Sequence, residues 1–241
     1  MQLRASPRAP GAERAPALLP DPCRWSAVAL LAACVAVTAV LGAHYAGRGP
    51  GRLDAALDPR IRAVLGRFPV LLRWLPDLGT LVPATVMTAA LVLACLAARR
   101  WMGAVLAALA VPAATALTEY VLKPVVGRTL GSSLSFPSGH ATFAFALAGV
   151  CAVLLLQPPR RRVPGVARLL LALMAMLLAA AVAAAMVAIG AHYFTDAVAG
   201  AAVGTGTVLA CALTLDRVTA RRGWRSAADR NPRVSQRAGS S

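Results

Sequence analysis

Six long runs without Asp, Glu, Lys or Arg limit the fold of this chain more than any other feature of its sequence. The runs are Trp25–Gly47, Leu78–Ala98, Trp101–Thr118, Ala141–Pro159, Leu169–Ala191 and Ala197–Leu215. Each has roughly the 17 to 25 residues that an α-helix needs to cross the hydrocarbon core of a bilayer. A helix also pairs all of its backbone polar groups internally, as lipid requires. The sequence therefore predicts an all-α fold, a six-transmembrane-helix bundle.

Composition excludes the common soluble classes. Hydrophobic residues make up 59% of the chain and charged residues 14%, whereas about 25% of a typical soluble domain is charged. The chain is also too apolar to be disordered. The five cysteines form no CxxC pair and no zinc-binding spacing, so we expect small buried hydrophobes rather than a disulfide or metal framework. An integral membrane protein is the class that remains.

The distribution of basic residues predicts the orientation of the bundle. The formal net charge is +16, and seventeen of the 25 basic residues fall in the two tails and in the turns on the same side of the membrane. By the positive-inside rule, both termini are cytoplasmic. These residues flank the apolar runs instead of lining one folded face, so we expect a membrane with anionic headgroups as their partner and no nucleic acid.

Four segments divide the chain. Residues 1–24 and 219–241 are rich in Arg, Pro, Ala and Ser, and we expect disordered basic cytoplasmic tails. Residues 25–218 form one six-span membrane domain. Its outer loop, 48–77, has leucines near helical spacing between arginines and aspartates, which predicts one or two amphipathic helices on the outer leaflet. This loop is either a lid or a structural surface helix, and we favour the structural role.

The first cluster of polar residues follows the third apolar run. It contains Glu119, Lys123 and Arg128, and Lys123 is the only lysine of the chain. Pro124 disfavours helix at the residue before it, so the third span is expected to end at Lys123. Two cations in such a loop are suited to hold a phosphate. The alternative is that both are cations at a helix end that reach out to the interface.

Two further clusters begin the fourth and sixth runs. Ser138, Gly139 and His140 offer a serine, free N–H groups at a helix N-terminus and a proton donor. His192 and Asp196 are four apart, so on a helix they share a face and the carboxylate can orient the imidazole. The alternative for both clusters is helix capping. The charge rule puts all three clusters on the outer face, where together they suit phosphoryl transfer.

The spacing of these residues resembles that of a known family. Lys123-x4-Arg128, then PSGH at 137–140, then His192-x3-Asp196 are similar to motifs of the type 2 phosphatidic acid phosphatase/haloperoxidase superfamily, in its membrane lipid phosphatase branch. The resemblance covers roughly residues 78–218. Either motif alone is weak, whereas PSGH and HxxxD about 50 residues apart in a six-span protein are specific.

The resemblance implies a role for each residue. His192 would be the nucleophile that forms a phosphohistidine, Asp196 its orienting partner and His140 the general acid. Four residues would bind the phosphate: Lys123, Arg128, Ser138 and Gly139. Lipid phosphatases of this kind use no metal, so we expect no cofactor.

Two positions depart from the family pattern. Arg-Pro usually stands where this chain has Leu130 and Gly131, and Ser-Arg where it has Ala185 and Met186. Two arginines that would bind phosphate are therefore missing. Removing one such donor typically costs about 10²–10³ in rate. Three arginines of the outer loop are candidates to replace them: Arg48, Arg52 and Arg73.

These observations predict a lipid phosphatase that acts on the outer face of a bacterial plasma membrane. Its substrate is expected to be a polyprenyl diphosphate or phosphate, with phosphatidic acid or phosphatidylglycerol phosphate next. The alternatives are a non-catalytic lipid-phosphate binding protein of the same fold and a lipid phosphotransferase. A channel is disfavoured because no charged residue lies in the middle of a run. The sequence leaves the oligomeric state open.

Overall fold

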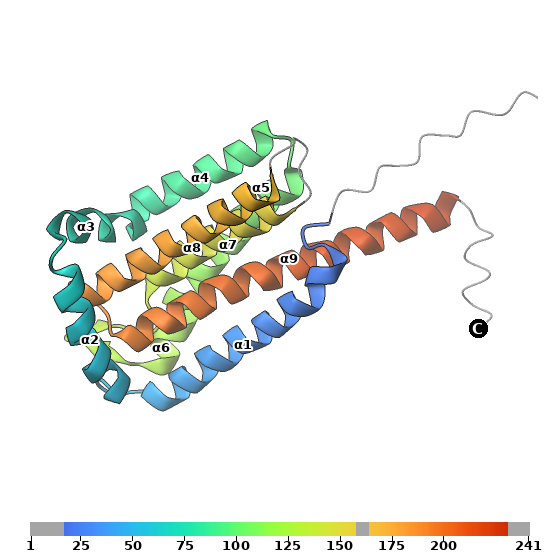
Figure 1. Cartoon of the computed structure of the whole chain (residues 1–241). Helices are drawn as coiled ribbons and strands as arrows, with labels where there is room; N and C mark the ends of the chain where they lie inside the picture. The colour runs from blue at the N-terminus through green and yellow to red at the C-terminus, as the bar shows by residue number, and fades with distance from the viewer. Residues whose placement is uncertain (1–16, 158–163, 231–241) are drawn as a thin grey trace, which may run out of the picture.

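Helices account for 81% of the part of the chain that the computed structural model describes, residues 17–157 and 164–230. The long helices lie side by side in a bundle (Figure 1). In chain order the elements are α1 (Asp21–Tyr45), α2 (Arg52–Leu65), α3 (Pro69–Trp74), η1 (Pro76–Gly79), α4 (Leu81–Ala97), α5 (Trp101–Ala116), η2 (Leu117–Leu122), α6 (Lys123–Val126), β1 (Thr129–Leu130), β2 (Ser133–Leu134), α7 (Gly139–Leu156), α8 (Gly165–Ala188) and α9 (Phe194–Arg230).

Five helices in the described part of the chain are long and apolar enough to cross a membrane. They are Pro22–Tyr45, Trp101–Val126, Gly139–Leu156, Gly165–Ala188 and Phe194–Arg221. A sixth span is present if Pro69–Gly79 and Leu81–Ala97, which meet at a bend of 69°, count as one. The all-α fold is therefore confirmed, and five or six such helices fit an integral membrane protein. The cytoplasmic position of the termini stays a prediction.

Small residues bring the helices of the bundle together. Helix α7 packs against α5, α8 and α9. A Cβ atom added to Gly204 of α9 would overlap the backbone carbonyl of Thr142 of α7, so the two backbones approach closely there. Leu106, Val150 and Val208 are almost completely buried between these helices. Close approach of this kind stabilises helix pairs in lipid, where the hydrophobic effect does not.

Pro124 led us to expect that the third span ends at Lys123. The helix instead continues past this residue. Helix α5 continues through η2, a turn of π-helix, into α6, which ends at Val126. Pro124 lies in the first turn of α6, where a missing N–H is tolerated. Gly127 then adopts φ 62° and ends the helix. The predicted loop follows as a short hairpin of β1 and β2, with Gly131 at φ 61° between them.

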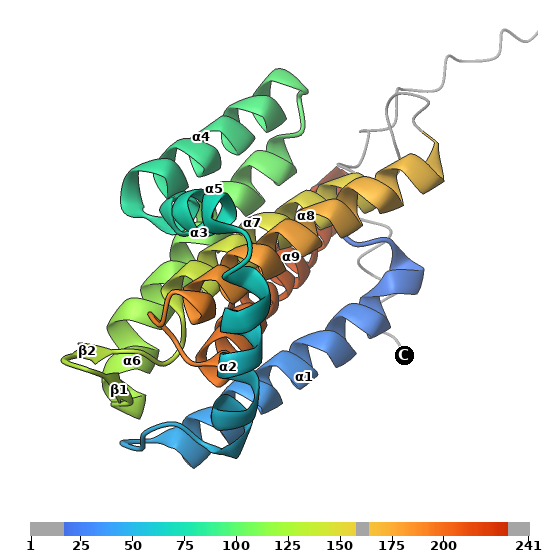
Figure 2. The same cartoon turned by 60° about the vertical axis from the view of Figure 1, so that its left-hand side comes forward.

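The segment 48–77 contains two helices, α2 and α3, as the spacing predicted. Their orientation is informative. Asp54 and Asp58 are the buried residues of α2, while Leu53 and Val64 are 54% and 57% exposed. The carboxylates thus face the bundle, where Ile61 also packs, while Leu53 and Val64 face outward, as expected for a helix at a lipid surface. Figure 2 shows α2 crossing the end of the bundle that also carries α6 and the β-hairpin, called the hairpin end below.

Helix extends into both segments that were expected to be disordered tails. Helix α1 begins at Asp21, and α9 continues to Arg230. The backbone N–H groups of Leu18 and Leu19 donate to the carboxylate of Asp216 at 2.7 and 2.9 Å, and both leucines are buried. These bonds hold the start of α1 against α9, which the composition of the tails did not indicate. The rest of the predicted tails, 1–16 and 231–241, lies outside the described residues, as does the segment 158–163.

Candidate functional site

The three polar clusters of the sequence lie together at the hairpin end. The segment around Lys123 ends the third span, Ser138 precedes α7, and His192 precedes α9. Helix α2 crosses the same end (Figure 2). Residues far apart in the chain therefore meet where the helices end, at the edge of the apolar bundle.

An ion pair covers the N-terminus of α7. Lys123 Nζ lies 2.8 Å from Glu119 Oε2, and their side chains are 16% and 38% exposed. A Cβ atom added to Gly139 would overlap Glu119 Oε1 and would lie 4.0 Å from Lys123 Nζ. Glycine at position 139 therefore lets this ion pair approach the first free N–H groups of α7, which attract anions.

His140, the second residue of α7, stands beside the same ion pair. Its ring lies against Gly79 of η1 and close to the backbone of Pro76. His192, Lys123 and Glu119 are all near enough to act on His140 electrostatically. The fold therefore brings the two histidines and the lysine into one cluster.

Ser138 connects the starts of α7 and α9. Its side chain is fully buried, and its Oγ accepts from the N–H of Ala141 at 3.4 Å, so it caps α7. Its own N–H donates to the backbone carbonyl of Asp196 at 3.0 Å. Ser138 thus caps α7, as the alternative interpretation of this cluster had it. A phosphate bound here would contact the backbone of this turn rather than the buried hydroxyl.

His192 lies in the turn before α9, which begins at Phe194. The expected shared helix face with Asp196 is therefore not what brings the two together. Asp196 Oδ2 instead accepts from the N–H of Tyr193 at 3.1 Å and lies 3.7 Å from His192 Nδ1. This distance exceeds a hydrogen bond, and the buried Nδ1 has no partner among the described residues. Because Asp196 caps α9, its carboxylate lies beside the imidazole, and a small shift would bring the two into hydrogen-bond range.

Arg128 is fully buried and holds two carboxylates. Its NH1 donates to Asp196 Oδ1 at 2.6 Å, and its NH2 donates to Asp54 Oδ2 at 2.6 Å. The guanidinium lies between two rings, 4.2 Å from the centroid of Tyr45 and 4.3 Å from that of Tyr193. The resemblance gave Arg128 a phosphate to bind, whereas both of its terminal nitrogens bind carboxylates within the protein.

Two aspartates of α2 complete this buried network, and the sequence interpretation missed both. Asp54 Oδ1 accepts from the N–H and the hydroxyl of Thr195 at 3.0 and 2.8 Å. Asp58 Oδ1 accepts from the N–H of Phe194 at 3.0 Å. Carboxylates from α2 therefore satisfy the first N–H groups of α9. In the sequence, the two aspartates are four residues apart. This spacing places them on one face of a helix whose other faces are apolar and basic, and it could have indicated a shared role.

Burial and hydrogen bonding act in opposite directions on these two aspartates. Burial alone would raise the pKa of Asp54, but hydrogen bonds from Gly51, Thr195 and the Arg128 guanidinium outweigh it and lower that pKa. Burial raises the pKa of Asp58, and its single bond from Phe194 only partly opposes this. Asp54 is thus held as the carboxylate that pairs with Arg128.

Where the family pattern has arginines, the chain has Leu130 in β1 and Met186, 5% exposed, in α8. The suggested replacements Arg48, Arg52 and Arg73 are exposed, and Arg73 lies over Trp74. A different arginine reaches the end of α8. Arg62 Nε on α2 donates to the carbonyl of Val187 at 3.5 Å. A Cβ atom added to Gly190 would lie 4.0 Å from its NH2.

The described residues contain no group of three or more His, Cys, Asp or Glu side chains arranged to hold a metal ion. The cluster has titratable and charged groups of its own. These are two histidines, one lysine paired with a glutamate, and a buried carboxylate beside one histidine. Such a set is able to bind an anion, to attack it and to move a proton.

Comparison with known proteins supplies a family for this arrangement. Residues 111–220 match the family model described as PAP2 superfamily. Neither a curated protein nor a solved structure matches the chain. The matched range contains Lys123, Arg128, the turn before α7, and the segment from His192 to Asp196, but not α1 or α2. The part of the chain that carries the histidine cluster is thus similar to the PAP2 superfamily.

Proposed function

We propose that this protein is a membrane lipid phosphatase that works through a phosphohistidine and needs no metal. The observation that carries the proposal is the meeting of His140, His192 and Lys123 at the end of a bundle of apolar helices. Members of the PAP2 superfamily are typically phosphatases. A reactive cluster at the edge of the spanning helices is placed to meet a headgroup whose chains stay in the bilayer.

The phosphate of the lipid would bind at the start of α7. Its oxygens would accept from the N–H groups of Gly139 and His140 and from Lys123 Nζ, which gives up part of its pairing with Glu119. Arg62 would add positive charge from α2, beside the turn that carries His192. These donors would stand in for the arginines missing at 130 and 186.

The reaction would proceed in two displacements at phosphorus. In the first, His192 Nε2 attacks, the P–O bond to the lipid breaks, and His140 protonates the leaving oxygen. In the second, water attacks the phosphohistidine, His140 accepts a proton from this water, and phosphate leaves. His192 Nδ1–H would donate to Asp196 Oδ2 during both steps. The 3.7 Å separation must shorten by roughly 1 Å for that bond, and such contacts commonly tighten when substrate binds.

Arg128 would act on this reaction without contacting phosphate. It fixes one oxygen of Asp196, and Asp54 fixes Arg128 in turn. The other oxygen of Asp196 remains directed at His192. We therefore assign Arg128 and Asp54 as positioning residues, in place of the phosphate-binding role that the motif spacing gave Arg128.

We propose a polyprenyl diphosphate or phosphate as the substrate, with phosphatidic acid or phosphatidylglycerol phosphate as the second class. The asymmetry of basic residues supports an extracytoplasmic site in a bacterial plasma membrane with both termini inside. An outward-facing site would act on carrier lipids left after a headgroup has been transferred.

The test is phosphate release by the purified full-length protein in detergent with excess chelator, using these four lipids one at a time. We expect release from one class and a loss of about 10⁴-fold or more in His192→Ala. His44→Gln, which changes the histidine at the end of α1, is the matched control and should keep its activity. Release that persists in His192→Ala would disprove the mechanism.

Two other outcomes would replace this function. The Glu119 pairing of Lys123 and the missing arginines favour a protein that binds lipid phosphate without cleaving it. Such a protein would retain the lipid and release no phosphate. A phosphotransferase would consume one phosphorylated lipid and produce another, with little free phosphate.

A further inference from the structure

The outward side of α2 carries three exposed arginines: Arg52, Arg60 and Arg67. Helical turns continue past the end of α2, since the N–H of Phe68 donates to the carbonyl of Leu65 at 2.9 Å. Steps of eight and seven residues along one helix place the three arginines on the same side. This side of the helix is called the arginine face below.

The arginine face has no counterion among the described residues. None of its three guanidinium groups forms an ion pair or a hydrogen bond with them. The acidic residues of α2 lie on the opposite side, where Asp54 and Asp58 are 0% and 5% exposed and bind Arg128 and the N–H of Phe194. The negative charge of this helix is thus turned into the bundle, and its positive charge is turned outward.

Apolar side chains accompany these arginines. Leu53 and Val64 are 54% and 57% exposed. Positions 53, 60, 64 and 67 follow one another at steps of seven, four and three, so leucine, valine and two arginines share one stripe. In Figure 2, α2 runs across the end of the bundle, so the stripe lies where the spanning helices end. A helix in the membrane interface has this composition, because its basic groups contact headgroups while its apolar side chains contact the acyl boundary.

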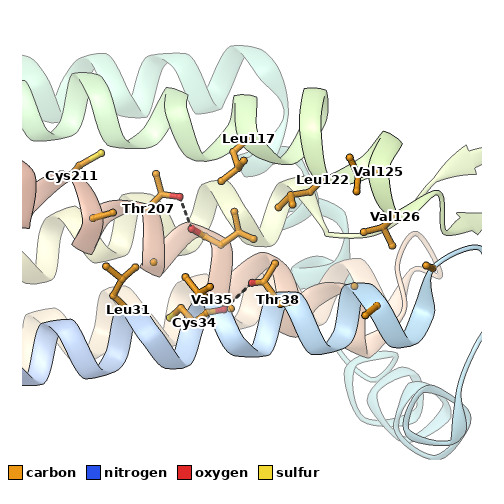
Figure 3. A pocket seen from close by; sticks show the side chains of 18 residues that line it. Leu31, Cys34, Val35, Thr38, Leu117, Leu122, Val125, Val126, Thr207 and Cys211 are labelled. Carbon is orange, nitrogen blue, oxygen red and sulfur yellow. Dashed lines mark hydrogen bonds between the residues drawn. The ribbon is translucent and has the colours of Figure 1, made fainter.

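The groove between α1, the third span and α9 is a lipid-facing surface of the opposite kind. Its volume is about 710 Å³, and none of its lining residues carries a charge. In Figure 3, Leu31 and Val35 of α1 and Leu117 and Leu122 of the third span point into it. Such a lining contacts hydrocarbon and does not distinguish one headgroup from another. A preference among headgroups requires charged side chains such as those of the arginine face.

We infer that the arginine face binds the headgroups of anionic phospholipids at the membrane surface, with its guanidinium groups on phosphate oxygens and with Leu53 and Val64 in the acyl boundary. A zwitterionic headgroup brings its own cation, whereas an anionic headgroup supplies the counterion that this face lacks. The carboxylates that hold the start of α9 lie on the other side of α2. Lipid binding at the arginine face is therefore separate from the chemistry of the histidine cluster.

The inference is tested with one fluorescent reporter on the face. Val64→Trp places a tryptophan between Arg60 and Arg67, and the four native tryptophans, at positions 25, 74, 101 and 224, are replaced by phenylalanine. The full-length protein is reconstituted into phosphatidylcholine vesicles that contain an equal fraction of either brominated phosphatidylglycerol or brominated phosphatidylcholine. We expect phosphatidylglycerol to quench about 5-fold more strongly, which is the effect of one basic residue near an anionic surface. Equal quenching by the two lipids, or none by either, would overturn the inference.

A triple variant tests whether the arginines cause the difference. With Arg52→Gln, Arg60→Gln and Arg67→Gln combined, the excess quenching by phosphatidylglycerol should fall toward 1, while quenching by phosphatidylcholine persists because the apolar contact remains. Salt at about 1 M should have the same effect, since it screens exposed charges. Arg221→Gln, which changes an exposed arginine near the end of α9, is the control and should keep the excess. An unchanged excess in the triple variant would disprove the role of the arginines.

A second measurement keeps the native tryptophans, in case their replacement unfolds the protein. The protein is exchanged from vesicles of equimolar phosphatidylglycerol and phosphatidylcholine into detergent, and the retained lipids are counted by native mass spectrometry. The ratio of phosphatidylglycerol to phosphatidylcholine should be lower in the triple variant than in the wild type. Ala39→Phe, whose side chain would fill the uncharged groove, should leave this ratio unchanged. Thermal unfolding checks that each variant is folded, and identical ratios in the wild type and the triple variant would contradict the inference.

Discussion

Lys123 and Arg128 are five residues apart in one segment, and both are paired with acidic residues, yet their surroundings are opposite. Lys123 has one partner four residues away on the same helical segment, and both side chains contact solvent. Arg128 has two carboxylate partners on α2 and α9, and no atom of the three side chains is exposed. The motif spacing had assigned the same task to both cations.

The difference shows which cation is available to a ligand. A partly exposed pair is worth about 0–1 kcal/mol, so a phosphate can displace Glu119 from Lys123 at little cost. Removing a partner from a buried pair costs about 3–5 kcal/mol, because the charge that remains has lost its hydration. Lys123 is therefore free to exchange partners, whereas Arg128 maintains the position of other groups.

The largest effect is expected for Arg128→Ala. Loss of the guanidinium would leave Asp54 and Asp196 buried without a cation and should lower the free energy of unfolding by about 3–5 kcal/mol. Thermal unfolding of the purified protein in detergent measures it. Arg67→Ala, an exposed arginine just after α2, is the control and should unfold like the wild type.

A second variant separates charge from packing at this site. Arg128→Met combined with Asp54→Asn removes two buried charges at once and should recover part of the stability that Arg128→Met alone loses. If Arg128→Ala unfolds at the wild-type temperature and only its affinity for lipid phosphate falls, the buried network is not what holds this end together.

Lys123→Gln should separate activity from stability. Without the ammonium group, kcat/KM for lipid phosphate hydrolysis should fall by about 10²–10³, while the free energy of unfolding should change by less than about 1 kcal/mol. Lys123→Arg keeps the charge and should recover part of the rate. A large loss of stability in Lys123→Gln, similar to that in Arg128→Ala, would remove the distinction between the two cations.

Acid should weaken the buried network through Asp54. The folded-state pKa of Asp54 lies below its usual value, which is about 3.9 in an unfolded chain. Its contribution to stability is therefore complete above about pH 5 and is lost as the pH falls through the folded-state pKa. Asp54→Asn should cost about 1–3 kcal/mol at neutral pH.

The comparison for this prediction is the change in unfolding temperature between pH 7 and pH 3. That change should be smaller in Asp54→Asn than in the wild type. Asp58, whose pKa is raised, contributes with the opposite sign, so Asp58→Asn should not reduce the change. An identical acid sensitivity in Asp54→Asn and wild type would contradict the prediction.

The smallest effect is expected for Glu119→Gln. Removing the carboxylate frees Lys123, so the apparent KM for lipid phosphate should fall by about 2- to 5-fold, which corresponds to the energy of a partly exposed ion pair. Steady-state kinetics with one lipid phosphate measure the change. A rise in KM would indicate that Glu119 orients Lys123 rather than competing for it.

Much of the fold follows from local sequence. The apolar runs predicted the all-α bundle, because a segment of about 20 apolar residues in lipid satisfies its backbone only as a helix. The loop predicted after the third span is present as the hairpin of β1 and β2. The boundaries were less accurate: a π-helical turn carries the third span past Pro124, and α9 continues beyond 218. Both depend on hydrogen bonds that composition does not encode.

The candidate site, like the fold, was predicted from the sequence only in part. Sequence spacing identified His140, His192 and Lys123, because each lies where an apolar run begins or ends and such ends meet at a membrane edge. It did not identify Asp54 or Asp58, and it did not predict the two carboxylates that pair with Arg128. Arg128 pairs with residues 74 positions earlier and 68 positions later in the chain.

By itself, then, the sequence determined that this chain forms spanning helices with a histidine cluster at their ends, since hydrophobic length and helix-end signals act over neighbouring residues. Only the tertiary structure decided which cation is buried and which is available. That choice depends on how α2 lies across the starts of α7 and α9, and on the cost of leaving a charge unpaired away from water. A carboxylate that arrives from α2 pairs with one terminal nitrogen of Arg128, whose other terminal nitrogen binds Asp196.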